Sequence, residues 1–426
     1  MIAIEKIKVK NYLTLRDVDL ELKNLNVLIG PNGAGKSNLL DVFSLINEAV
    51  SGAPQQGSLR NAIIKNRRGM DELLWDHGSE SKEMEFTVHI SDDEKNIQKM
   101  FVKFYSKLYF SLRLEQQSKQ SASYDITHEA FKPVNHKALA RPPDTSLMQQ
   151  QLDFYDRDRE SRVTFTSVGT LRCGREPSDI NVGEGKLKYP QELVVIQKTD
   201  EKLYPYVARL KDYLSSWTIH TYFDTSMDAR MRAAQEVYAE TRLSHKGDNL
   251  PLVLQHLHNS GEWEKTISPR IKDLYEYFLD ISFQPEGAGK IQLSWKEKNL
   301  EKGIPASRLS DGALRFLCLV AILCNPDPAP LICIDEPETG FHPDALLTIS
   351  EMLKEASKKT QIIVTTHSPD LVSCFEDPEN VVVVERGVDG GTSFRRLSLE
   401  ELKPWLEEEM SLGTIWRGNL FGGNRW

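Results

Sequence analysis

The residues with the clearest chemical potential lie between Gly30 and Ser37, where the sequence reads GPNGAGKS. This run matches G-x-x-x-x-G-K-[ST], a pattern whose glycines let backbone N–H groups curl around a phosphate. A short apolar stretch at residues 25–29 precedes it, and helical spacing follows it, which is the context the pattern requires. A plain glycine turn before a helix is the alternative. The run predicts a nucleoside triphosphate site, with Lys36 at the β- and γ-phosphates and Ser37 as a ligand of Mg²⁺.

Two carboxylates end a second apolar stretch, Leu331–Ile334. Asp335 at the end of such a strand fits a Mg²⁺ ligand, and Glu336 fits the base that orients or deprotonates the attacking water. An apolar strand that ends in Asp-Glu is common by chance. Its combination with the phosphate motif is what predicts a catalytic pair.

The run Leu309–Gly312 reads LSDG and precedes the apolar residues 313–323. It resembles the signature of ATP-binding-cassette (ABC) proteins, with Asp311 in place of the commoner glycine. Ser310 and the backbone near Gly312 would present donors to an anion, and the start of the helix would add its positive end. Ser310 and Asp311 are also helix-capping types, so a simple N-cap is the alternative. The position shortly before the acidic strand favours a signature.

A histidine follows a third apolar strand, at residues 361–366. At that place His367 can contact the γ-phosphate or the attacking water, whereas a capping or core histidine is the alternative. The other motifs favour the first interpretation. The predicted catalytic residues are therefore Glu336, His367 and Lys36.

The elements that must position these side chains follow from the apolar spacing. Residues 2–10 and 18–22 read as strands, and residues 84–115 read as antiparallel strands. Helical spacing returns from about residue 200 to 279, and from 310 onward helices and strands alternate as in an α/β core. We expect three parts: 1–115 and 291–426 as the two halves of one nucleotide-binding head, and 116–290 as an insertion that is mixed at first and then helical.

Taken in order, the motifs resemble those of the ABC ATPase heads of the RecF, SMC and OLD-nuclease group, in particular the small RecF-like "AAA family" ATPases of bacteria. The resemblance covers residues 1–50 and roughly 245–426. It includes Asn11-Tyr12, the run Gly312–Leu317 and the run Glu336–Pro343. It implies an α/β fold with an ABC-type P-loop head, an antiparallel β subdomain and a helical middle insertion that serves as a lid or arm.

The resemblance also implies the cofactors ATP and Mg²⁺ and a head-to-head homodimer, or a higher even oligomer. Each ATP would lie between the P-loop of one subunit and the signature of the other, so that Ser310 and Gly312 act in trans. His367 would be the switch histidine, and Ser37 and Asp335 the metal ligands. The implied nucleotide-binding residues are Gly30, Asn32, Gly33, Gly35, Lys36, Ser37, Asn38, Ser310 and Gly312.

The sequence departs from this family pattern in three places. Leu13 stands where repair-type relatives often carry a basic residue that reaches the nucleotide. No secure Q-loop glutamine is present, and residues 74–78 occupy its expected region. The chain ends about 40 residues after Val384, which we expect to be too soon for the C-terminal nuclease domain of the OLD group.

Composition narrows the class of protein. The 426 residues are 40% hydrophobic and 27% charged, ordinary values for a globular protein. No apolar run approaches the roughly 18 residues that span a bilayer, so we expect a cytoplasmic protein without membrane contact. The five cysteines form no CxxC pair and are expected to be buried and reduced. The net charge of −9 argues against a surface adapted to nucleic acid throughout, although residues 60–68 form a basic patch that is either a solvated loop or a phosphate-binding one.

Several functions compete. A transport subunit is disfavoured because Lys36 and Ser310 lie 274 residues apart. A self-contained nuclease would need a metal site, and the acidic runs 91–94 and 153–158 read instead as helix caps and turns. A DNA repair or recombination ATPase of the RecF/SMC type is the main alternative. We favour a sensor or regulatory ATPase of bacterial anti-phage defence that acts with a separately encoded effector, plausibly a nuclease.

Overall fold

The computed structural model describes residues 3–51, 58–75, 82–91, 107–116, 124–134, 179–182, 185–188 and 205–423. They form two compact units, each built from separate stretches of the chain. The first unit comprises Met1–Lys23, Gly33–Trp217 and Glu385–Phe394, and the second comprises Asn24–Asn32, Thr218–Val384 and Arg395–Trp426. The three-part division drawn from the sequence stays a prediction. Cys173, residues 76–78, the run 153–158 and most of the run 91–94 lie outside the described residues.

The first unit contains a five-stranded antiparallel sheet in the order β2-β1-β4-β5-β6. Its strands are β1 (Ala3–Tyr12), β2 (Leu15–Glu21), β4 (Glu83–Ser91), β5 (Lys107–Gln116) and β6 (Tyr124–Val134). Buried and half-buried residues alternate along β4, as they do in a strand with one covered face. The strands predicted in residues 2–10 and 18–22 are confirmed, and so are the antiparallel strands predicted within 84–115 for the described residues 84–91 and 107–115.

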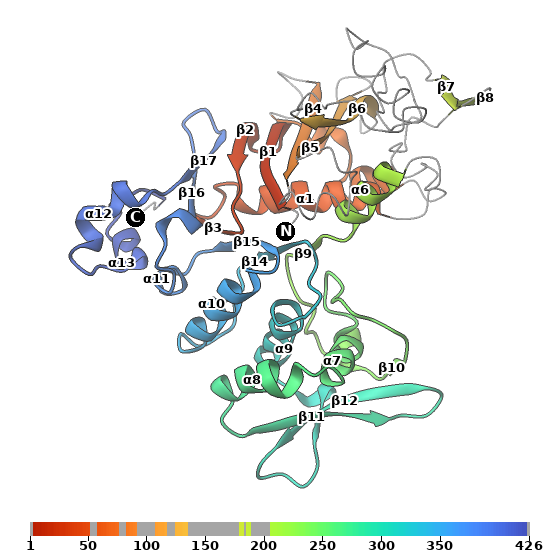
Figure 1. The fold of residues 1–426 in the computed structure, drawn as a ribbon, viewed down its shortest axis with the longest axis vertical. Coiled ribbons are helices and arrows are strands. Elements are labelled where there is room, and N and C mark those ends of the chain that lie inside the picture. Colours follow the sequence, from red (N-terminus) through yellow and green to blue (C-terminus); the bar gives the residue numbers. More distant parts are fainter. Residues whose placement is uncertain are drawn as a thin grey trace, which may run out of the picture. The chain divides into compact units, whose positions relative to one another are not determined.

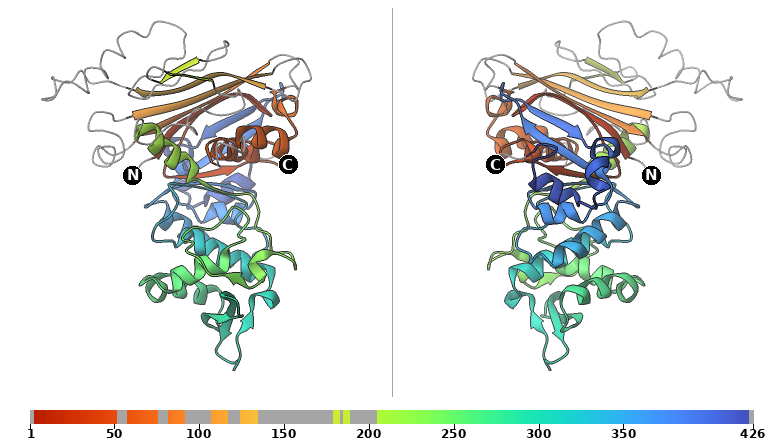
Figure 2. Two further views of the ribbon diagram at one scale, coloured as in Figure 1. Left: turned by 90° about the vertical axis from the view of Figure 1, so that its right-hand side faces the viewer. Right: turned by 90° about the vertical axis from the view of Figure 1, so that its left-hand side faces the viewer.

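Helix α1 (Lys36–Val50) lies beneath this sheet in both views of Figure 2. Its apolar side chains recur at helical spacing and are buried, and the ring of Phe43 meets that of Trp217 edge-on at 5.8 Å. The buried amide of Asn47 donates to the carbonyl oxygens of Leu214 at 2.9 Å and Trp217 at 3.2 Å. Asn47 thus satisfies acceptors at the end of α6 that the helix itself leaves unpaired. The unit's remaining elements are α2 (Ser58–Arg60), η2 (Asn61–Lys65), α3 (Met70–Leu73), β7 (Asp179–Val182), β8 (Gly185–Lys188) and α6 (Pro205–Ser215).

Arg67 ties α1 to the segment that follows it. Its guanidinium is only 8% exposed and lies 2.6 Å from Oδ1 of Asp41 and 3.0 Å from Oε1 of Glu48. The hydroxyl of Tyr12 donates to the other oxygen of Asp41 at 2.5 Å. From the sequence, the basic patch at residues 60–68 was expected to be either a solvated loop or a phosphate-binding one. Both interpretations are wrong for Arg67, because two carboxylates of α1 accept the hydrogen bonds of its guanidinium.

We expect Arg67→Met to lower the free energy of unfolding by about 3 kcal/mol, since it leaves two half-buried carboxylates unpaired. Burial alone would raise the pKa of Glu48, but the hydrogen bonds and charge of Arg67 outweigh burial and hold that pKa below its usual value. This contribution is therefore present above the unfolded pKa of Glu48 and is lost as pH falls through the lower folded value. Urea unfolding of the variant and the wild type from about pH 7 down to about pH 3 measures it. The difference in free energy of unfolding between the Arg67 variant and the wild type should shrink on acidification. The exposed control Arg68→Met should show no such difference. A difference in free energy of unfolding that stays constant with pH would contradict the pairing of Arg67 with these carboxylates.

A six-stranded sheet has the order β17-β16-β3-β15-β14-β9 (Figure 1), and all of it belongs to the second unit except the end of β16 and most of β17. Its strands are β3 (Leu25–Ile29), β9 (Thr218–His220), β14 (Leu331–Asp335), β15 (Gln361–Thr366), β16 (Val381–Arg386) and β17 (Thr392–Arg396). Strands β9, β14, β15, β3 and β16 pair with one another in parallel, and β3 and β15 are buried throughout. The carboxyl ends of parallel strands meet at one edge, so the residues that follow β3, β15, β14 and β9 lie along that edge.

Helix α9 (Asp311–Leu323) is buried on almost every side within the second unit. In Figure 1, α7, α8 and α9 lie between the parallel strands and the hairpin of β11 (Phe278–Pro285) and β12 (Lys290–Glu297). The other elements of this unit are η5 (Arg230–Arg232), β10 (Gln235–Glu236), α7 (Leu250–His258), η6 (Trp263–Ile267), α8 (Ser268–Leu274), β13 (Ile304–Pro305), η7 (Ala306–Arg308), α10 (Ala345–Ala356), α11 (Pro369–Ser373), η8 (Pro378–Asn380), α12 (Leu399–Leu406) and α13 (Leu412–Arg417). The alternation of helix and strand predicted from residue 310 onward is confirmed.

The helical spacing predicted from residue 200 to 279 holds only in part. Between the end of α6 and the start of α7 the chain forms β9 and then a long irregular segment, residues 221–249, with short elements in it. Polar side chains there bond the local backbone: Asp224 accepts from the N–H of Ser226 at 3.1 Å, and Arg232 donates to the carbonyl of Thr225 at 3.1 Å. Such bonds compete with helical ones, which explains why the apolar period misled the prediction.

The four described cysteines are free thiols. Cys318 and Cys333 are fully buried, and burial raises the pKa of both well above the usual value. Burial also raises the pKa of Cys324, to about 12. The prediction of buried, reduced thiols is confirmed for Cys318 and Cys333, whereas Cys324 and Cys374 are free but only half-buried. Buried thiols are poor nucleophiles. Within the described part of the chain, no helix combines the length and the apolar character that crossing a membrane demands.

Candidate functional site

The glycine-rich run begins where β3 ends and leads into α1. Gly30, Gly33 and Gly35 have φ angles of 150°, 75° and 111°. A Cβ at Gly30 would lie 2.2 Å from the carbonyl oxygen of Val384, and one at Gly35 would lie 2.2 Å from Oγ1 of Thr392. A Cβ at Gly33 would meet nothing within 4 Å, so its positive φ alone requires glycine there. Only glycines can build this turn.

Helix α1 starts directly after Gly35 without a side-chain cap at its N-terminus. Its first N–H groups and the positive end of its dipole suit an anion, and Lys36 adds a positive charge that is 4% exposed. Asn32 and Ser37 are exposed beside it. The donor set of this loop therefore fits a polyphosphate.

Asn38 serves the loop in a different way. Its amide donates to Oγ1 of Thr14 at 2.8 Å, and the same hydroxyl lies 2.7 Å from Oγ1 of Thr392. Oγ1 of Thr392 in turn lies 2.8 Å from the carbonyl oxygen of Ala34. Thr14 and Thr392, which are far apart in the sequence, thus hold the glycine-rich loop in place through hydrogen bonds. No sequence motif had pointed to either threonine.

Asp335 and Glu336 end β14 at the carboxyl edge of the second unit's sheet. Asp335 pairs in register with Thr365 of β15, whose hydroxyl donates to the Asp335 carboxylate. The N–H of Glu336 donates to Oγ1 of Thr365 at 3.1 Å. Glu336 has a φ of 47°, a conformation that costs a residue with a side chain of order 1 kcal/mol or more.

His367 follows β15 and meets Glu336 across this edge. Nε2 of His367 lies 3.4 Å from Oε1 of Glu336. The backbone N–H of His367 donates to Oε1 of Glu338 at 3.1 Å, and the hydroxyl of Thr366 donates to the same oxygen at 2.5 Å. Burial raises the pKa of Glu338 and outweighs these two bonds. The buried carboxylate of Glu338 therefore holds the end of β15 and the backbone of His367 in place.

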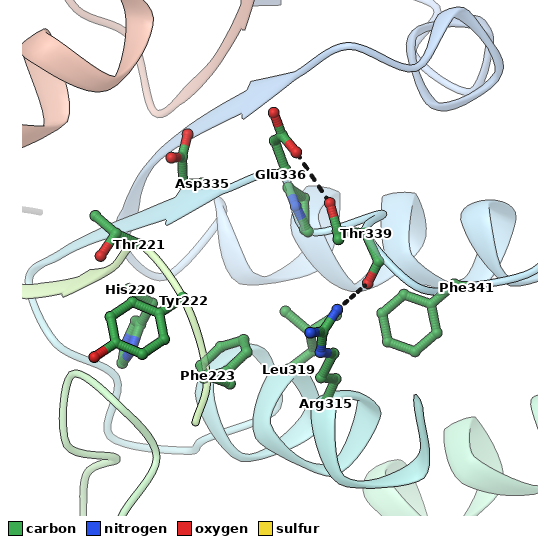
Figure 3. Close-up of a pocket in the computed structure, with 11 residues that line it drawn as sticks. His220, Thr221, Tyr222, Phe223, Arg315, Leu319, Asp335, Glu336, Thr339 and Phe341 are labelled. Atoms are coloured by element: carbon green, nitrogen blue, oxygen red, sulfur yellow. Dashed lines mark hydrogen bonds between the residues drawn. The ribbon is translucent and has the colours of Figure 1, made fainter. Parts of the chain in front are cut away.

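A pocket of about 140 Å³ opens beside the two strand-end carboxylates. Figure 3 shows Asp335 and Glu336 on one side of it and the side chain of Arg315 from α9 on another. Thr339 links the two sides, because its hydroxyl donates to Glu336 at 3.1 Å and its carbonyl oxygen accepts from Arg315 at 3.2 Å. The remaining lining comes from Leu319, Pro337, Phe341 and the residues around the end of β9, His220, Thr221, Tyr222 and Phe223.

Ser310 is exposed at the N-terminus of α9. Its hydroxyl accepts from the N–H of Ala313 at 3.2 Å, so the N-cap that the sequence offered as an alternative is present. A Cβ at Gly312 would lie 3.7 Å from the carbonyl oxygen of Gly340. Neither Ser310 nor Gly312 is among the described residues that line the pocket with Glu336.

The structure thus brings Asp335, Glu336 and His367 together, with Gly30 at the end of the next strand of the same sheet. Sequence reasoning missed the side chains that hold them, Thr365 and Thr366 above all. Two threonines just before a candidate histidine were a usable signal, because a polar pair at the end of a buried strand must find hydrogen-bond partners.

Comparison with known proteins agrees with this geometry. Residues 25–373 match the family described as "AAA domain, putative AbiEii toxin, Type IV TA system". The chain belongs to this family. It is 19% identical to the ATP/GTP phosphatase of Helicobacter pylori over 88% of this chain and 87% of that protein. It is 28% identical to the energy-coupling factor transporter ATP-binding protein EcfA of Methanosphaera stadtmanae, over 33% of this chain but only 53% of that protein, about half its length.

Solved structures give the same fold. The SMC head bound to the C-winged helix domain of ScpA superposes with a TM-score of 0.55 at 13% identity, over 93% of this chain and 99% of that one. The predicted α/β ABC-type head is confirmed, and so is the predicted relation to the RecF, SMC and OLD group of ABC ATPases. ATP and Mg²⁺ are the cofactors of such an ATPase.

Proposed function

We propose that this ABC-type ATPase hydrolyses ATP between two copies of itself. Lys36 offsets the charge of the β- and γ-phosphates, Glu336 orients the attacking water, and His367 holds Glu336 and the γ-phosphate in register. Bound Mg²⁺, with Ser37 and Asp335 as its ligands, supplies neutralisation of phosphate charge. Gly30, Gly33 and Gly35 present backbone N–H groups to the phosphates.

The exposed position of the signature carries this proposal. Ser310 stands exposed at the start of a long helix, a place suited to an anion. A second copy that docks on this surface would bring its nucleotide to Ser310. The resemblance of the signature to that of ABC ATPase heads implies a two-fold arrangement in which each copy gives one signature and receives one.

Ser310→Arg tests this arrangement. The variant should bind a fluorescent ATP analogue as a monomer with a dissociation constant within about two-fold of wild type, because the contact that it loses within its own copy is the N-cap of α9 and not a predicted contact with that copy's nucleotide. Its turnover should fall at least about 100-fold, since an arginine at the seam blocks docking of the partner's nucleotide. Exposed Asn299→Arg in the same unit is the control for added bulk and charge. Loss of binding and turnover together would count against the two-copy site.

We further propose that the ATPase is the sensor or regulatory subunit of a bacterial anti-phage defence system and controls a separately encoded effector. The family's description, which names a toxin of a toxin–antitoxin system, supports a role in such systems. The proposal assigns the effector chemistry to a separately encoded partner. Purification of the chain together with the products of its neighbouring genes tests this. A stable complex whose partner's activity depends on ATP would support it, and a chain that degrades nucleic acid alone would oppose it.

A further inference from the structure

Arg232 is a buried arginine in the irregular segment between β9 and α7, and its side chain is 4% exposed. All five of its N–H groups have acceptors. Nε contacts the carbonyls of Thr225 and Ser226, both at 3.1 Å. Nη1 donates to the carbonyls of Ala306 at 3.2 Å and Leu309 at 2.7 Å. The guanidinium therefore bridges two chain segments that are far apart in sequence.

The other terminal nitrogen of Arg232, Nη2, reaches a second residue of the signature run. Nη2 of Arg232 donates to Oδ1 of Asp311 at 2.6 Å, in addition to its bond with the carbonyl of Thr225 at 3.0 Å. Leu309 and Asp311 are the two sequence neighbours of Ser310. The guanidinium therefore donates hydrogen bonds to the chain on both sides of that serine. Asp311 is also the place where this sequence departs from the commoner glycine.

We propose that Arg232 is a positioning residue for the signature, and that Asp311 replaces the usual glycine in order to engage it. The inference rests on the two-copy site proposed above. The planar guanidinium of Arg232 holds the backbone of Leu309 and the first turn of α9 in place. It thereby sets the positions at which Ser310 and Gly312 meet the nucleotide of the other copy.

The shape of the contact favours arginine over any other cation. A lysine has one ammonium group and cannot reach two carbonyl-bearing segments and a carboxylate in fixed directions, whereas the planar guanidinium can. The Asp311 carboxylate is 66% exposed, so its ion pair contributes little to stability by itself. A conformational role for that bond explains its geometry better than a stabilising one.

Three substitutions test the proposal through turnover and nucleotide affinity. Arg232→Lys keeps the charge but loses the fork, Asp311→Ala removes the carboxylate, and Asp311→Asn keeps an acceptor oxygen. The first two should lower kcat about 10- to 100-fold and leave the monomer's affinity for a fluorescent ATP analogue within about two-fold. Asp311→Asn should recover most of the lost kcat. Exposed Arg230→Met, in the same short helix η5, is the matched control and should be neutral.

Mixed subunits separate a misplaced signature from a damaged fold. Arg232→Lys has an intact P-loop, and Lys36→Ala has an intact signature. Mixed in equal amounts, they should regain about a quarter of wild-type turnover, because half of randomly paired dimers are mixed and each holds one intact site. Asp311→Ala replaces Arg232→Lys in the mixture if the buried substitution prevents folding.

Mixing Ser310→Arg with Lys36→Ala gives the reference for these outcomes. Recovery there without recovery for the Arg232 and Asp311 variants would overturn the positioning role and leave the two-copy site standing. No recovery in any mixture would overturn the two-copy site itself. A folded Arg232→Lys with kcat within about two-fold of wild type would also refute the positioning role.

Discussion

Replacing Lys36 by alanine should abolish ATP turnover, with a loss of at least about 100-fold. The side chain is 4% exposed at the start of α1, so its charge is little screened by water. The turn before it is fixed by glycines at φ angles that other residues rarely adopt, so Lys36 stands at a defined place beside the phosphate-binding turn. Phosphate release measured at saturating ATP and Mg²⁺ gives the result.

The control for this variant is Lys358→Ala, which removes an exposed lysine near the end of α10. It should retain wild-type turnover. The Lys36 variant should also lose the rise in melting temperature that ATP gives the wild type, because a ligand stabilises the folded state only in proportion to its binding. Turnover within a few-fold of wild type would remove Lys36 from the phosphate site.

The sequence was sufficient for those parts of the site whose determinants are local. The glycine spacing of residues 30–37 is a property of one turn, and the structure needs those glycines for reasons that one turn explains. Strands β3, β14 and β15 were readable because uninterrupted apolar runs indicate strands covered on both faces.

What the sequence did not predict depends on contacts between distant residues. Nothing near Arg232 indicates that its guanidinium reaches Asp311, 79 positions further along the chain. The same holds for Thr392 behind the glycine loop and for Arg67 between two carboxylates of α1. A charged or polar residue gives no periodic signal, so its partner emerges only when the fold brings the two together.

The geometry around Glu336 combines three features that a water-activating carboxylate needs. It has a strained φ of 47°, its carboxylate oxygens lie 3.4 Å from Nε2 of His367 and 3.1 Å from Oγ1 of Thr339, and it lines a pocket large enough for water. Glutamine has almost the same shape and can keep the bond from Thr339. It cannot act as a base, since a neutral amide does not accept a proton at neutral pH.

Glu336→Gln should therefore bind ATP normally and fail to hydrolyse it, with turnover reduced about 100- to 10,000-fold. With the reaction stopped, the variant should accumulate as an ATP-bound dimer, which light scattering after gel filtration detects as a doubled mass in ATP and Mg²⁺ but not in ADP. Glu376→Gln, at an exposed glutamate of the same unit, is the matched control and should remain active. A Glu336 variant that keeps the mass of a monomer at saturating ATP would argue against the nucleotide sandwich. Retained turnover would instead argue against Glu336 as the base. Because the two readouts fail for different reasons, this one substitution tests the chemistry and the assembly separately.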